Sequence, residues 1–205
     1  MHEPTVHAAR LRLDIAPARF VVLCASELAP REGIDTVILA LSMLHRYHGI
    51  DAMLAVIAGA PADDDDRCTI AAAPVPWHGE QVELARLCHL AHDLGVARDV
   101  RFSLRAPPAA VDDYHAAADV FASTPWKASA ASASAVADAA ARALPVVGAA
   151  ELVRDGVTGY LVAARDPETL CRCLARLQRQ PRLARAMGAA GQTGIHATSH
   201  RKTRT

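Results

Sequence analysis

The stretch FVVLCASELAPREGIDTVILALSMLHRYHGIDAMLAVIAG, residues 20–59, indicates the class of fold. It begins with a short, β-rich apolar run from Phe20 to Cys24 and continues, after a loop, with an amphipathic segment at 34–48 that Gly49 closes. A second apolar run follows at 53–58. The order strand, helix, strand predicts a β–α–β unit whose two strands lie parallel.

The same alternation continues along the chain. It predicts an α/β fold, a Rossmann-like parallel sheet with helices on both faces. We expect a tail or linker at 1–19, one domain at 20–192 and a polar C-terminal tail at 193–205. The further strands are expected at 100–102, 120–122, 145–148 and 160–162, and the further helices at 81–94, 134–142, 167–178 and 182–190.

Composition narrows the class of partner. The 205 residues hold 22 Lys and Arg against 22 Asp and Glu, so the net charge indicates neither nucleic acid nor an anionic membrane as a partner. The five cysteines have no paired metal-type spacing, and no apolar run reaches the ~18 residues of a membrane span. We therefore expect a cytoplasmic protein with reduced thiols and no transmembrane segment.

Two other features suggest metal chemistry at first sight. The acidic run at 63–66 is expected to be a solvated surface loop rather than a carboxylate metal site. The histidine pairs 45/48 and 89/92 each have helical spacing but no third ligand nearby, which favours helix-surface histidines. We predict no metal site.

An ordered series of segments resembles one enzyme family. The order is more specific than any single segment, and the string DGxTGxLV followed three residues later by DPE is the rarest piece. From about residue 11 to about residue 202, the chain resembles the C-terminal domain of retaining GT-B glycosyltransferases of the group 1, or family 4, type. The segments are PREGID (30–35), LAVIAG (54–59), LGVARDVRF (94–102), AADVFASTPW (117–126), LPVV (144–147) and LVRDGVTGYLVAARDPETL (152–170).

The resemblance implies a donor site that binds a nucleotide-diphosphate sugar as substrate, with no separate cofactor. The family holds the diphosphate with a Gly-Arg pair and a following Lys, but here these positions align with Ser26-Glu27 and with Glu32. Both cations are thus replaced by carboxylates. Arg31 and Lys127 are candidates to take over, and the alternative is that both are ordinary surface cations.

The family's E-x7-E motif is also altered. Its first Glu aligns with Ala128, and its second acidic position aligns with Asp138, which either binds the ribose hydroxyls or complements the dipole of its helix. No catalytic residue is assigned. The implied donor-binding residues are Ser26, Glu27, Arg31, Gly33, Phe102, Thr124, Pro125, Trp126, Lys127 and Asp138.

Two functions follow from the resemblance. The first is a glycosyltransferase domain that transfers a hexosyl group and is incomplete or impaired alone. GT-B enzymes have two Rossmann-like domains, so this reading expects a missing N-terminal domain or a homodimer partner. The second is a non-catalytic pseudo-glycosyltransferase that acts as an interaction module.

Overall fold

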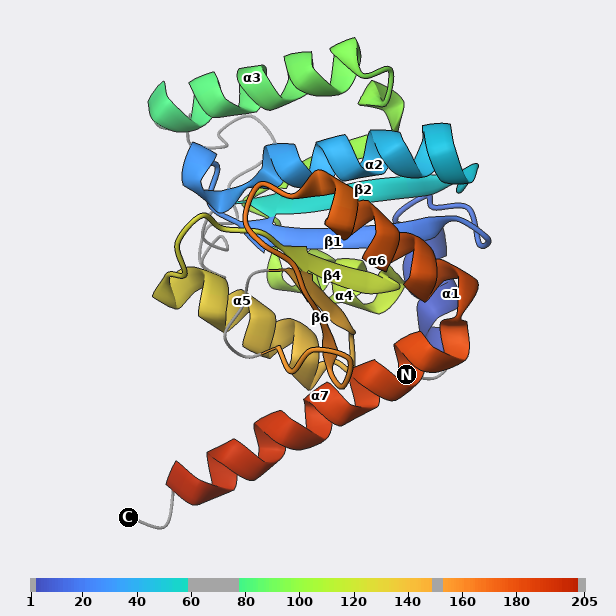
Figure 1. The fold of residues 1–205 in the computed structure, drawn as a ribbon, viewed down its shortest axis with the longest axis vertical. Helices are drawn as coiled ribbons and strands as arrows, with labels where there is room; N and C mark the ends of the chain where they lie inside the picture. The colour runs from blue at the N-terminus through green and yellow to red at the C-terminus, as the bar shows by residue number, and fades with distance from the viewer. Residues whose placement is uncertain (1–2, 59–77, 149–152, 203–205) are drawn as a thin grey trace.

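Six parallel strands form a single sheet in the computed structural model, which describes residues 3–58, 78–148 and 153–202 (Figure 1). Across the sheet the order is β3-β2-β1-β4-β5-β6, so the chain starts near the middle and builds outward in both directions. The predicted class of fold is confirmed. The strands are β1 (Phe20–Ser26), β2 (Ala52–Ala58), β3 (Val100–Leu104), β4 (Val120–Ser123), β5 (Val146–Gly148) and β6 (Gly159–Leu161).

Helices connect the strands and cover both faces of the sheet (Figure 1). Two short 3₁₀ turns, η1 (Pro30–Glu32) and η2 (Ala97–Asp99), lie in the connections. The α-helices are α1 (Glu3–Arg12), α2 (Ile34–His48), α3 (His78–Asp93), α4 (Pro108–Ala117), α5 (Ala130–Ala141), α6 (Pro167–Arg179) and α7 (Pro181–Lys202).

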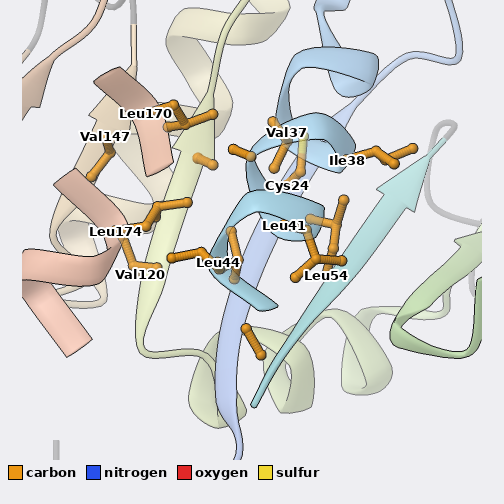
Figure 2. Packing of buried hydrophobic residues seen from close by; sticks show 14 of the residues in the cluster. Cys24, Val37, Ile38, Leu41, Leu44, Leu54, Val120, Val147, Leu170 and Leu174 are labelled. Atoms are coloured by element: carbon orange, nitrogen blue, oxygen red, sulfur yellow. The ribbon is translucent and has the colours of Figure 1, made fainter. Parts of the chain in front are cut away.

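The inner strands β1, β2, β4 and β5 are mostly apolar because both faces of the sheet are buried there. The edge strand β3, with Arg101 and Ser103, is only partly buried. In β1 the side chains alternate: Val22 and Cys24 belong to one hydrophobic cluster, and Val21 and Leu23 belong to the other. The first cluster is completed by α2, α3 and α6, and the second by α1, α4 and α5. Figure 2 shows the first cluster, where Leu41 of α2 lies beside Leu54 of β2. On the other side of the cluster, Leu174 of α6 lies beside Val120 of β4.

The N-terminal segment is a helix where the sequence predicted a tail or linker. Arg10 of α1 is buried, donates hydrogen bonds to the carbonyl of Ala117, and forms an ion pair with Asp119 at 2.8 Å. Arg12 forms a second pair with Asp113 at 2.6 Å. Because these contacts are with residues a hundred positions away, the local sequence pattern did not reveal that the segment packs against α4.

The C-terminal helix extends further than predicted. The sequence placed a helix at 182–190 followed by a polar tail, but α7 continues to Lys202 and projects from the body of the domain (Figure 1). Its described part packs closely: a Cβ at Gly188 would lie 1.9 Å from the carbonyl oxygen of Ala143. Within the described residues, no helix is long and apolar enough to cross a membrane.

Candidate functional site

Three loops meet at the carboxyl ends of the strands. They are the β1–α2 loop (27–33), the β4–α5 loop (124–129) and the β6–α6 loop (162–166). In a parallel sheet all the strands end at one edge, and ligands of open α/β sheets bind beyond that edge. The helices α2 and α5 begin there, at the left of Figure 1. The edge is therefore the candidate site.

Gly33 and Thr124 join the first two loops. The hydroxyl of Thr124, a buried residue, donates a 2.8 Å hydrogen bond to the carbonyl oxygen of Gly33. Gly33 has a φ of 71°, and a Cβ there would lie 2.1 Å from the Thr124 carbonyl oxygen. Nearby, the backbone N–H of Trp126 donates a hydrogen bond to the backbone carbonyl oxygen of Arg31 at 2.8 Å. The two loops are thus held together by one hydrogen bond from the Thr124 side chain and one between backbone groups.

The third loop joins through a cation–π contact. The guanidinium carbon of Arg165 lies 3.6 Å from the centroid of the Trp126 ring, which is 42% exposed. Arg165 itself is exposed and has a φ of 61°. The sequence prediction included Trp126 but missed Arg165. The only signal was its place just before the DPE of the family-like string, because the stacking depends on two loops far apart in sequence.

The charges of the β1–α2 loop are paired within the loop. Arg31 forms an ion pair with Glu27 and approaches Glu32 through its Nε at 3.4 Å. Glu32 is buried, with 4% of its side chain exposed. Burial raises the pKa of the Glu32 carboxyl, Arg31 acts in the opposite direction, and Glu27 raises this pKa further. Arg31, predicted as a candidate replacement cation, is thus already neutralised by two carboxylates.

The remaining residues of the edge are less constrained. Lys127 is exposed, whereas Pro125 is buried beside Thr124. Ser26 ends β1, with its Oγ 3.9 Å from the sulfur of Cys24. Burial raises the pKa of the Cys24 thiol to about 12, so this thiol stays protonated at neutral pH.

Two predicted site residues do not join the others. Phe102 lies within β3, which continues to Leu104, and it packs against the first hydrophobic cluster rather than standing in a loop. Asp138 was expected near the start of its helix, but α5 begins at Ala130 with a capping box at Ser129. Asp138 is therefore in the ninth position of the helix, about 12 Å along its axis from the edge.

The edge offers amide groups as well as side chains. The helices α2, α5 and α6 all begin there, and the first amides of a helix favour anions. Part of that capacity is used internally: the Asp35 carboxylate accepts from the Thr36 N–H at 2.8 Å, and Asp166 caps α6 by accepting from the Thr169 N–H at 2.9 Å. Amides in the first turns of α2 and α6 are thus already bound by carboxylates of the chain itself.

The histidine pairs have structural or surface positions. His45 lies 2.9 Å from the carbonyl oxygen of Ala52 through its Nε2, where β2 begins, while His89 and His92 are exposed. No group of three or more His, Cys, Asp or Glu that could hold a metal ion occurs among the described residues. The acidic run at 63–66 lies outside them.

Comparison with known proteins agrees with this architecture. The family model "Glycosyl transferases group 1" matches residues 8–194. The GDP-mannose-dependent alpha-(1-6)-phosphatidylinositol monomannoside mannosyltransferase of Mycolicibacterium smegmatis is 35% identical over 185 residues, which are 85% of this chain and 42% of that protein. The chain thus spans less than half the length of this relative.

Solved structures show the same fold at low identity. HepE of Anabaena, solved in complex with UDP and glucose, has a TM-score of 0.75 and 20% identity over 95% of this chain and 48% of its own. The C-terminal domain of the group 1 protein LpcC from Francisella tularensis, solved by itself, has a TM-score of 0.67 and 18% identity, covering 88% of this chain and 86% of its own. With the match over nearly its whole length, this chain belongs to the group 1 glycosyltransferase family.

Proposed function

We propose that this chain is the donor-binding domain of a group 1 glycosyltransferase, with a reduced affinity for the nucleotide-diphosphate sugar. The reaction is transfer of a hexosyl group, with retention, and it requires the N-terminal GT-B domain as a partner. Family membership and the half-length coverage of the relatives support this proposal. So do the names of those relatives, which include a GDP-mannose-dependent enzyme and a protein solved with UDP and glucose.

The observation that carries the proposal is the pairing of Arg31 with Glu27 and Glu32. The family places cations at the positions of both carboxylates, beside the start of α2. At an effective dielectric near 20, two unit charges ~4 Å apart interact by ~4 kcal/mol. Replacing a cation by a carboxylate therefore exchanges attraction for repulsion of similar size, and screening by solvent reduces both. We expect the affinity for a diphosphate to fall by orders of magnitude.

Two cations at the edge lie outside this arrangement. Arg165 stacks on Trp126, and Lys127 follows directly on the same loop. Stacking leaves the N–H groups around the rim of a guanidinium able to donate, so Arg165 can still form bidentate contacts with a phosphate. These two cations, together with the amides at the start of α5, would support the charge of the leaving diphosphate.

The alternative is a non-catalytic interaction module. The same acidic loop favours it, because a buried Glu32 beside the expected diphosphate position opposes donor binding altogether. The two functions differ in whether any diphosphate-dependent affinity remains. Residual affinity supports the weakened donor domain, and its complete absence supports the module.

Calorimetric titration with UDP, GDP and their sugars tests the choice. We expect millimolar, diphosphate-dependent binding by the native chain, and much tighter binding by the variant Ser26→Gly/Glu27→Arg/Glu32→Lys, which restores the family's cations. The matched control is Asp51→Lys/Asp93→Arg, which adds the same charge at exposed sites near the other edge of the sheet. No binding up to millimolar ligand by either the native chain or the restored variant would rule out a donor site.

A further inference from the structure

The balanced total charge hides a strong separation along the chain. Eight of the 22 Lys and Arg, but none of the 22 Asp and Glu, lie at positions 169–205. The first 168 residues therefore hold 14 basic and 22 acidic side chains, a net charge of −8. One end of the sequence is basic and the remainder is acidic.

The structure places five of these cations on exposed helix surfaces. Arg172, Arg176 and Arg179 are spaced four and three residues apart on α6, so they share one side of that helix, and all three are exposed. The opposite side of α6 is buried in the first hydrophobic cluster. Only one residue separates α6 from α7, where Arg182 and Arg185 are also exposed.

The end of α2 extends this surface. The Nη2 of Arg179 lies 3.2 Å from the Nδ1 of His48, which places the last turns of α6 and α2 side by side. Arg46 and Tyr47 are exposed in that turn of α2, and 66% of Tyr47 is accessible to solvent. An aromatic residue with a polar tip thus stands among the arginines.

Among the described residues, few carboxylates lie near this surface. One is Asp155, whose negative charge raises the pKa of the Cys173 thiol on α6. On α6 itself carboxylates are confined to the start, where Asp166 caps the helix and Glu168 follows it. Asp51 and Asp99, at the starts of the strands, both pair with Arg19. The positive charge of the helix surface is therefore largely uncompensated.

We propose that this basic face (Arg46, Arg172, Arg176, Arg179, Arg182 and Arg185) docks on the anionic phospholipid surface of a membrane. Clusters of roughly four to eight Lys or Arg are the composition that anionic lipid headgroups attract. A guanidinium binds a lipid phosphate with two hydrogen bonds, and an exposed tyrosine suits the interfacial layer.

The charge distribution favours a lipid surface over nucleic acid. A nucleic acid that extends beyond the basic face meets the acidic remainder of the chain, whereas a flat membrane meets the basic face alone. This proposal goes beyond the proposed donor function and does not depend on it. Apart from Arg172, which donates to the hydroxyl of Thr169 in the first turn of α6, the face lies toward the far end of α6 from the candidate site.

Sedimentation of the full chain with lipid vesicles tests the proposal. The vesicles are made of phosphatidylcholine alone, or of equal parts of phosphatidylcholine and phosphatidylglycerol. The test variant is Arg172→Gln/Arg182→Gln/Arg185→Gln, which keeps good helix formers. The matched control, Arg12→Gln/Arg98→Gln/Arg142→Gln, removes the same charge from other surfaces, and thermal unfolding confirms that both variants are folded.

We expect binding to the anionic vesicles only, and weaker binding as salt is raised. The test variant should lose roughly a hundredfold in vesicle partitioning, while the control should lose much less. The proposal is overturned if the native chain does not bind anionic vesicles, or if both variants lose equally. It is also overturned if duplex DNA binds the native chain more tightly than the vesicles do and loses affinity with the same test variant.

Discussion

Substituting Gly33 by Ala should disrupt the junction between the β1–α2 and β4–α5 loops. A Cβ at this position would lie 2.1 Å from the Thr124 carbonyl oxygen and 2.9 Å from its Oγ1. The left-handed backbone conformation costs an L-residue roughly 1–2 kcal/mol, and forced overpacking adds about 1–3 kcal/mol. The hydrogen bond from Thr124 to Gly33 contributes about 1 kcal/mol more if it breaks. With all three contributions, we expect a loss of about 3–6 kcal/mol in the free energy of unfolding.

Gly49 provides the matched control for this substitution. It has a similar φ of 61° at the end of α2, but a Cβ there would meet nothing within 4 Å. Gly49→Ala should therefore cost only about 1 kcal/mol, the backbone strain without the clash. Urea denaturation of both variants measures the difference. If the two lose the same stability within about 0.5 kcal/mol, the close approach of the loops does not hold.

Three further predictions concern single side chains. Asp166→Ala should lose about 1 kcal/mol of stability at neutral pH. Hydrogen bonds from Thr169 hold the pKa of Asp166 below its ordinary 3.8. The stabilisation is therefore present above pH 3.8 and is lost as the pH falls through the lowered pKa. A stability difference between the native chain and the variant that persists in acid would contradict the cap. A thiol reagent at mildly alkaline pH should modify the exposed Cys88. Cys24, whose pKa is about 12, should stay unmodified until the chain unfolds. Mass spectrometry of the labelled peptides shows which thiol has reacted, and early labelling of Cys24 would contradict its burial. Arg165→Gln should uncover the Trp126 ring and shift its fluorescence emission to longer wavelength, whereas Arg98→Gln should not; equal spectra would rule out the stacked pair.

Elements with their own start and stop signals were predicted well. The helix expected at 34–48 has those bounds in the structure, because the left-handed Gly33 and Gly49 lie at its two ends. The buried strands were found to within two residues, since continuous apolar runs leave little choice of register. By contrast, α5 starts four residues before its predicted position at 134. Its first turn is Ala- and Ser-rich and carries no periodicity, and only the capping contact between Ser129 and Ser132 shows where it starts.

The sequence indicated which loops form the candidate site, but not which residues of these loops contact one another. The resemblance identified the β1–α2 and β4–α5 loops, and the structure joins them through Gly33 and Thr124. The sequence pattern offered Arg31 as a free cation, although its neutralisation by Glu27 and Glu32 depends on the turn that folds the three together. Arg165 was missed for the same reason. Side-chain pairing across loops is decided by tertiary geometry, which spacing along the chain does not encode.

In the β1–α2 loop, the positive charge of Arg31 is cancelled by the carboxylates of Glu27 and Glu32. The most direct measurement compares the affinity for UDP with that for uridine, in the native chain and in Ser26→Gly/Glu27→Arg/Glu32→Lys. We expect the diphosphate to add a small but measurable affinity in the native chain and at least about a hundredfold more in the variant, equivalent to ~2.7 kcal/mol. A diphosphate contribution that is already large in the native chain, and unchanged in the variant, would contradict this expectation.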